Sequence, residues 1–136
     1  MMMVSKKTSI FAFSVLLFLF GGLSSSWATH ISQPILINPK TQYIIGESVT
    51  LHGWVNYNDQ AAADVLLNFK VIRPNGTVLT DQSYPSNAEG QFEFKLDTKG
   101  EAPGNYQITI TSHCLEIHRY ACTYKSQSLV IQLMNP

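Results

Sequence analysis

The sequence predicts an all-β protein built as an antiparallel sandwich, and three observations lead to this prediction. Apolar and polar residues alternate with a period of two along residues 48–56, which is the pattern of a half-buried strand. Several further short runs alternate in the same way, and turn-forming Gly, Pro, Asn and Asp residues separate them. After residue 28 no segment shows a helical period.

The first 28 residues have the three parts of a secretory signal peptide. Lys6 and Lys7 form a basic region, residues 10–20 form an apolar run, and Ser26 and Ala28 are the small residues of a cleavage site. The alternative, an uncleaved anchor helix, is disfavoured because the apolar run is well short of the roughly 20 residues that a membrane span needs. We therefore expect an exported protein, periplasmic or extracellular, with no membrane span after cleavage.

Cleavage after Ala28 leaves residues 29–136, a length that suits one domain with a single core. Without Lys6 and Lys7 the chain has seven basic and nine acidic residues, so its net charge is about −2. No basic stripe is present. This composition argues against nucleic acid or an anionic membrane surface as the partner.

Seven strands are predicted in the exported part of the chain. The segments, in order, are 29–40, 48–56, 65–72, 78–83, 91–96, 105–112 and 125–133. Pro34 and Pro39 make the first an edge strand or an extended lead-in, because proline cannot donate to a sheet ladder. Asn75 and Gly76 predict a tight hairpin turn between the third and fourth strands, since both tolerate positive φ.

This number of short strands with regular turn signals is typical of an immunoglobulin-like β-sandwich. A closed barrel is the alternative. The spacing of cysteine, tryptophan and cysteine found in antibody domains is missing, because Trp54 is on the wrong strand and both cysteines come late in the chain.

Several segments resemble one family. Residues 43–53 (YIIGESVTLHG) resemble the opening of the second macroglobulin-type domain of alpha-macroglobulins, and residues 65–76, 89–94 and 103–110 resemble later strands of that domain. Bacterial immunoglobulin-like modules share much of this pattern. The resemblance implies a sandwich used as a spacer or interaction module. It does not imply protease inhibition, because the thioester and the bait region of those inhibitors lie in other domains.

Cys114 and Cys122 are the two cysteines, and in an exported chain they predict one disulfide. Placed opposite each other on a hairpin of the last two strands, they centre its turn at His118. Closing so short a loop stabilises by about 2.5 kcal/mol in the chain-entropy model. Continued outward, this register turns Ile131 away from the core face, and a β-bulge near 125–128 would correct it.

The loop inside the bridge is rich in side chains that anchor protein interfaces. These are Leu115, Ile117, Arg119 and Tyr120. Large side chains on a rigid loop lose little entropy on binding, so the loop is a candidate partner-binding surface. The alternative is that the same side chains cover the end of the sandwich.

A metal site is the second hypothesis. The loop region carries four donors of types that bind zinc or copper, namely His113, Cys114, His118 and Cys122. Their spacing matches no common zinc finger, and an oxidising compartment favours the disulfide. His30, next to the predicted amino terminus, could also bind Cu(II) together with the terminal amine.

The motifs of common enzyme active sites are not found in the sequence. There is no nucleophile elbow, no glycine-rich phosphate loop and no helical pair of histidines. We therefore expect a non-catalytic, cofactor-free module that binds an unidentified protein or cell-envelope partner. The alternative function is a small periplasmic protein that binds copper or zinc.

Overall fold

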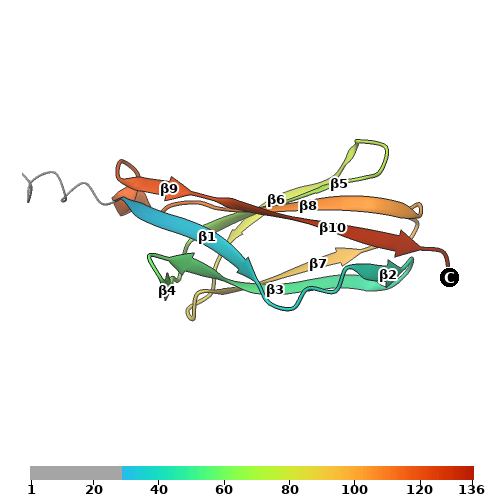
Figure 1. Cartoon of the computed structure of the whole chain (residues 1–136), viewed down its shortest axis with the longest axis horizontal. Helices are drawn as coiled ribbons and strands as arrows, with labels where there is room; N and C mark the ends of the chain where they lie inside the picture. Colours follow the sequence, from blue (N-terminus) through green and yellow to red (C-terminus); the bar gives the residue numbers. More distant parts are fainter. Residues whose placement is uncertain (1–28) are drawn as a thin grey trace, which may run out of the picture.

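The computed structural model describes residues 29–136, and the predicted signal peptide, residues 1–28, lies outside the described residues. In the described part of the chain, ten strands form two sheets packed face to face (Figure 1). The strands are β1 (His30–Leu36), β2 (Gln42–Ile44), β3 (Ser48–Tyr57), β4 (Gln60–Ala61), β5 (Leu66–Ile72), β6 (Val78–Pro85), β7 (Gln91–Asp97), β8 (Gly104–Ser112), β9 (Cys122–Tyr124) and β10 (Ser126–Met134). A 3-10 helix, η1, spans Glu116–His118. None of the helical structure within 29–136 is long and apolar enough to cross a bilayer.

One sheet has the strand order β4-β3-β1-β9, with β7 also paired to β3. The other has the order β2-β10-β8-β5-β6. The pairs are antiparallel except that β9 runs parallel to β1 and β2 runs parallel to β10. The predicted all-β, immunoglobulin-like sandwich is therefore confirmed, and three short segments, β2, β4 and β9, add to the seven predicted strands.

The alternation in β3 determines which of its faces enters the core. Val49, Leu51 and Val55 are fully buried, whereas His52 on the opposite face is exposed. Gly53 continues the buried row, and a Cβ there would collide with the Ile35 carbonyl and the Phe92 ring. The absence of a side chain at this position lets two backbones and an aromatic ring approach closely.

The core lies between the two sheets and combines aliphatic and aromatic side chains. Its buried apolar residues are Tyr43, Val49, Leu51, Val55, Tyr57, Val65, Leu67, Phe69, Val71, Phe92, Phe94, Leu96, Tyr106, Ile108, Ile110, Ile131 and Leu133. At its centre the Phe69 ring stacks with the rings of Tyr84 and Phe94, with centroids 4.6 and 5.0 Å apart. Offset aromatic pairs of this kind add to the stability that apolar burial provides.

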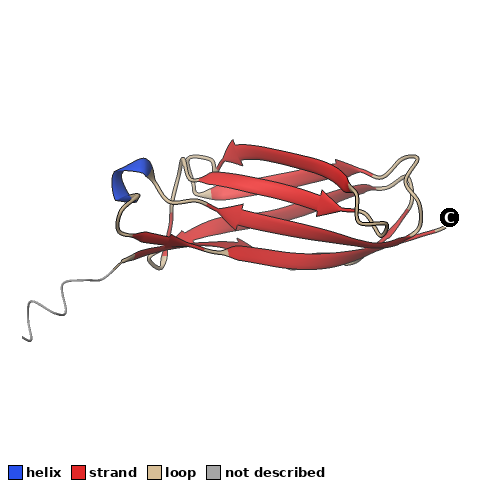
Figure 2. Ribbon diagram, turned by 90° about the horizontal axis from the view of Figure 1, so that it is seen from above, coloured by secondary structure: helices blue, strands red, loops and turns tan. Residues whose placement is uncertain are grey.

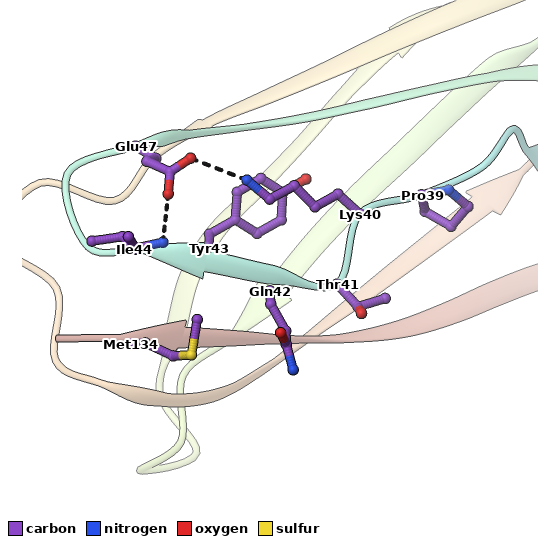
Figure 3. Close-up of a pocket in the computed structure, with 8 residues that line it drawn as sticks. All are labelled: Pro39, Lys40, Thr41, Gln42, Tyr43, Ile44, Glu47 and Met134. Carbon is purple, nitrogen blue, oxygen red and sulfur yellow. Dashed lines mark hydrogen bonds and ion pairs between the residues drawn. The ribbon is translucent and has the colours of Figure 1, made fainter. Parts of the chain in front are cut away.

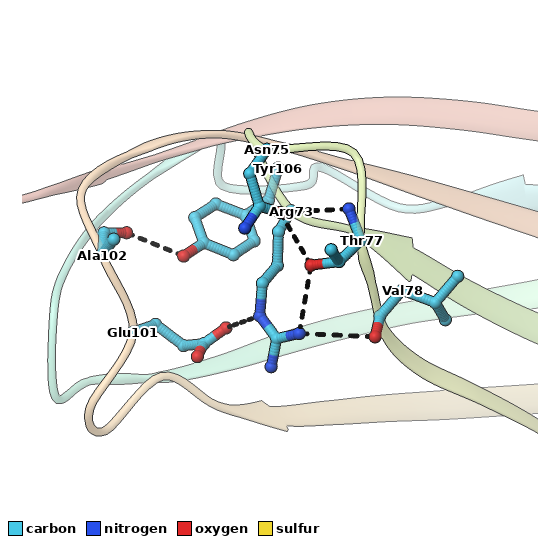
Figure 4. A network of polar contacts seen from close by, with 7 residues as sticks. All are labelled: Arg73, Asn75, Thr77, Val78, Glu101, Ala102 and Tyr106. Carbon is cyan, nitrogen blue, oxygen red and sulfur yellow. Dashed lines mark hydrogen bonds and ion pairs between the residues drawn. The ribbon is translucent and has the colours of Figure 1, made fainter.

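A polar network closes one end of the sandwich, where the β5–β6 turn meets the β7–β8 connection (Figure 4). Tyr106 Oη donates to the carbonyl of Ala102, 2.7 Å away, which is the tyrosine corner typical of immunoglobulin-like sandwiches. Beside it, Arg73 Nε donates to Glu101 Oε1 at 2.8 Å, and Nη1 donates to the carbonyl of Val78 at 3.4 Å. These contacts fix the predicted hairpin turn to the neighbouring loop.

Two extended segments of the chain each contribute a strand to both sheets. The first crosses between β1 and β2, and the second crosses between β9 and β10. Pro34 lies on β1 beyond the three residues, 30–32, that pair with β9. The prediction of an edge strand or an extended lead-in holds only in part, because β1 lies between β3 and β9 over residues 30–32, whereas at Pro34 no strand pairs on the second side and none needs its missing N–H.

The predicted hairpin of the last two strands is wrong in its geometry. β8 ends at Ser112, and the chain then forms η1 and β9, which pairs with β1 instead of β8. Only β10 returns to β8, with Ile131 opposite Tyr106 and buried. The change of sheet after β9, not a bulge in a continuous hairpin, sets the register that buries Ile131.

Candidate functional site

The loop of residues 113–121 lies at the end of the sandwich where β1 begins, opposite the C-terminus (Figures 1 and 2). The predicted disulfide between Cys114 and Cys122 is present and closes this loop, with the two Cα atoms 6.1 Å apart. Inside it, Ile117 is 84% exposed and Tyr120 is 89% exposed. We refer to residues 113–121 as the disulfide loop.

The four predicted partner-binding residues occupy different environments. Leu115 packs against the core, and its N–H donates to Tyr57 Oη at 3.4 Å. Arg119 Nη1 donates to Glu116 Oε1 at 2.8 Å, and its guanidinium lies over the Tyr120 ring at 4.7 Å from the centroid. The solvent-facing surface of the loop therefore includes the large side chains of Ile117 and Tyr120 beside the ion pair of Arg119 and Glu116.

A histidine pair anchors the disulfide loop to the first strand. The imidazole rings of His30 and His118 stack with centroids 3.7 Å apart and an angle of 17° between their planes. The Tyr57 hydroxyl lies 2.7 Å from His118 Nδ1 and 3.7 Å from Cys122 Sγ. The backbone N–H of His30 donates to the carbonyl of Ala121 at 2.8 Å.

Asn58 determines which nitrogen of the His30 ring accepts a hydrogen bond. Its Oδ1 accepts a hydrogen bond from the N–H of Ile31 at 2.7 Å, which assigns the other side-chain atom, Nδ2, as a donor. Nδ2 lies 2.7 Å from His30 Nδ1, so that nitrogen must accept, and in this arrangement the neutral ring carries its proton on Nε2. Asn58 adopts a φ of 51°, a left-handed conformation that asparagine tolerates better than most residues.

The predicted metal donors are only partly brought together. His30 and His118 are in contact, but their Nδ1 atoms are engaged by Asn58 and Tyr57, and both cysteines are in the disulfide. His113 lies apart and contacts the ring of Tyr124, with centroids 5.3 Å apart. Over residues 29–136 no group of three or more His, Cys, Asp or Glu side chains is arranged to hold a metal ion.

Sequence reasoning missed Tyr57 and Asn58 as parts of this site. Tyr57 lies 61 residues from His118 and Asn58 lies 28 residues from His30, and nothing local distinguishes them from the end of a strand and a loop asparagine. An Asn-Asp pair with positive φ at 58 and 59 is a turn signal, and that signal alone does not indicate a partner.

Open cavities lie at both ends of the sandwich, and two of them concern this site and its opposite end. One, of about 480 Å³, lies beside the disulfide loop and is lined by residues of that loop, β5 and β9. The other, of about 500 Å³, lies at the opposite end beside β2 and Met134 (Figure 3). There Glu47 accepts from the N–H of Ile44 and pairs with Lys40 at 3.1 Å, and these contacts, in that order, lower the pKa of its carboxyl.

The fold and this loop define an immunoglobulin-like β-sandwich with a disulfide-closed loop at one end. No protein-family model matches the chain, and no curated protein matches it. Among solved structures it is similar to a β-glucosidase from Listeria innocua in complex with isofagomine, with 10% identity and a TM-score of 0.49, over 77% of this chain and 16% of that one. It is also similar to a CARDB domain from Pyrococcus furiosus in complex with di-metal ions, with 11% identity and a TM-score of 0.43, over 77% of this chain and 87% of that one.

The chain thus spans about a sixth of the length of the β-glucosidase. At these identities and scores, neither similarity bears on what this chain binds.

Proposed function

We propose that the chain is an exported, non-catalytic β-sandwich module that binds a protein partner through the disulfide loop. The observation that carries the proposal is the pair Ile117 and Tyr120, two large side chains that are 84% and 89% exposed. A disulfide and the contacts of His30, Tyr57 and His118 hold the backbone beneath them.

A rigid loop of this kind suits recognition for a physical reason. When the loop is already held, binding immobilises few additional rotatable bonds and so costs little conformational entropy. More of the free energy of burying Tyr120 and Ile117 then contributes to affinity. Tyrosine is among the residue types that contribute most at the centres of protein interfaces. Arg119, stacked on Tyr120, adds a flat cationic surface beside the aromatic ring.

Export and the module role are consistent with further observations. A disulfide persists in oxidising compartments, which agrees with the signal peptide predicted over residues 1–28. The resemblance of residues 43–110 to a macroglobulin-type or bacterial immunoglobulin-like module supports an accessory role in a larger assembly. The periplasm and the cell exterior both suit such a protein.

The proposal is tested by site-specific photocrosslinking of the full chain in its own host. A benzophenone amino acid replaces Tyr120 in one variant and Val78, an exposed residue at the start of β6, in the control. We expect one discrete crosslinked protein from position 120 and none from position 78. Equal crosslinking from both positions, or none from either, would overturn the proposal.

A double variant shows whether the two exposed side chains matter for binding alone. Ile117→Ala with Tyr120→Ala is expected to leave the thermal midpoint within about 2 °C, because neither side chain is buried. The crosslink from a second reporter at Arg119 should be lost in that variant. A large fall in the midpoint would mean that the side chains are structural.

A metal-binding role is the second candidate, and one observation favours it. The fold brings His30 and His118 together although they are distant in sequence. The Nδ1 atoms of the two rings are engaged by Asn58 and Tyr57, so copper or zinc would have to bind through the Nε2 atoms or displace those contacts. Native mass spectrometry of the exported protein with Cu(II) or Zn(II) tests this, and retention of one ion that is lost in His30→Ala with His118→Ala would support it.

A further inference from the structure

The cavity beside the disulfide loop has an apolar floor. Leu66 on β5 and Tyr124 on β9 line it, and they are 46% and 57% exposed. The disulfide of Cys114 and Cys122 also lines the cavity. At about 480 Å³ the cavity is within the usual size of ligand sites, although it is open to solvent.

The charges that line the cavity do not cancel. Arg119 and Glu116 form an ion pair with each other at 2.8 Å. Asp64 is the remaining acidic residue of the lining, and within residues 29–136 its carboxylate has no ion pair or side-chain hydrogen bond. Its backbone is held in a left-handed conformation, with φ of 61° and its N–H donating to the carbonyl of Ser86. The Asp64 carboxylate is therefore the negative charge in the lining that has no ion-pair partner among residues 29–136.

We propose that this cavity receives a lysine or arginine side chain of the partner protein, with the charged end at Asp64. The methylene groups of such a side chain would lie on Leu66 and Tyr124, as basic side chains do when they cover apolar surface. The face of the Tyr124 ring attracts a cation as well. This inference rests on the proposed function, since it names the chemistry of the partner at the same end of the module.

Other occupants fit the cavity less well. An anionic group would meet Arg119, which is already paired with Glu116, and would be repelled by Asp64. A purely apolar side chain would remove Asp64 from water without supplying a counter-charge, which is unfavourable. A basic side chain satisfies both the apolar floor and the carboxylate.

The cavity and the exposed tip form one continuous surface. Glu116 and Arg119 belong to the disulfide loop and also line the cavity, and Arg119 stacks on Tyr120. A partner that buries Tyr120 therefore also reaches Arg119, which lines the same cavity as Asp64. One arginine or lysine of the partner could then contact the apolar lining of the cavity and the Asp64 carboxylate within the same interface that buries Tyr120.

The test uses two small compounds of the same shape on the full exported protein. N-acetyl-arginine amide is compared with N-acetyl-citrulline amide, which lacks the positive charge, in a titration followed by amide NMR. We expect the arginine compound alone to shift the amide signals of Leu66, His113 and Tyr124. Asp64→Asn should weaken that binding about three- to fivefold, as expected for an exposed charge pair, whereas Glu89→Gln on the β6–β7 loop should leave it unchanged.

Equal binding of citrulline, shifts elsewhere on the protein, or equal affinities of the Asp64→Asn and Glu89→Gln proteins would each overturn the inference. Its failure is distinguishable from failure of the proposed function. Loss of cavity binding leaves the photocrosslink from position 120 in place if the loop binds a partner by other chemistry.

Discussion

His30 and His118 stack ring on ring, with centroids 3.7 Å apart, and so connect the first described strand to the disulfide loop. The contact depends on the parallel pairing of β1 with β9, which places His30 opposite Cys122. Tyr57 then contacts Nδ1 of His118, and Asn58 donates to Nδ1 of His30. The exposed loop is thereby supported from the sandwich on one side and closed by its disulfide on the other.

Removing the Asn58 side chain should loosen this support. Asn58→Gly keeps the left-handed backbone available but loses the hydrogen bonds to Ile31 and His30. We expect a loss of about 1–2 kcal/mol in the free energy of unfolding, measured by urea denaturation, and faster hydrogen exchange at the His30 and Ile31 amides.

Asp59→Gly is the matched control for that change. Asp59 also has positive φ, at 66°, and its side chain makes no hydrogen bond among the described contacts of residues 29–136. We expect little loss of stability and unchanged exchange at His30. If both variants behave alike, the backbone and not the Asn58 side chain supports the loop.

The disulfide should stabilise the whole domain and not only the loop. Replacing Cys114 and Cys122 by serine is expected to cost about 2.5 kcal/mol, because the unfolded chain regains the freedom of the closed loop. Urea unfolding of the two proteins measures the difference. A change below about 0.5 kcal/mol would mean that the fold holds the loop without the bridge.

Gly53 should not accept even a methyl group. Gly53→Ala places a Cβ against the Ile35 carbonyl and the Phe92 ring, so β1 or β7 must move away from β3. We expect a loss of about 2 kcal/mol or more from overpacking, seen as a lower urea midpoint. His52→Ala, on the exposed face of the same strand, is the control and should change stability by less than about 0.5 kcal/mol.

Alkaline unfolding should depend on Tyr84. Burial first, and the charge of Glu93 second, raise the pKa of Tyr84 to about 12 from an ordinary value of 10.0. The folded protein thus favours the neutral phenol, and its stabilising effect is complete below pH 10 and is lost as the pH rises towards 12. The neutral hydroxyl also donates to the carbonyl of Glu93 at 2.6 Å, and ionisation removes that donor.

Tyr84→Phe is expected to be less stable at neutral pH, because it loses the hydrogen bond, but to lose less further stability between pH 10 and 12. Tyr43 and Tyr106, whose pKa values burial also raises, remain in the variant, so part of the fall of stability with rising pH remains as well. Urea midpoints at several alkaline pH values measure both proteins. If the urea midpoints of the two proteins fall equally with rising pH, Tyr84 ionises as readily in the folded as in the unfolded protein.

Much of the sandwich could be predicted from the sequence because it depends on local patterns. The period of two in β3 determined its buried face, and the turn residues Asn75 and Gly76 placed the β5–β6 hairpin. The two cysteines, eight residues apart, indicated the disulfide. Each of these features follows from the conformation or chemistry of neighbouring residues, which a single sequence records directly.

The tertiary structure alone decided which strands pair where the chain changes sheets. Period-two alternation shows which face of a strand is apolar, but not which neighbour accepts its hydrogen bonds. β9 therefore could not be assigned to β1 instead of β8, and the contact of His30 with His118 could not be foreseen. That pairing depends on packing across the whole sandwich, because backbone groups at the edge of one sheet bond to whichever strand the completed core places beside them.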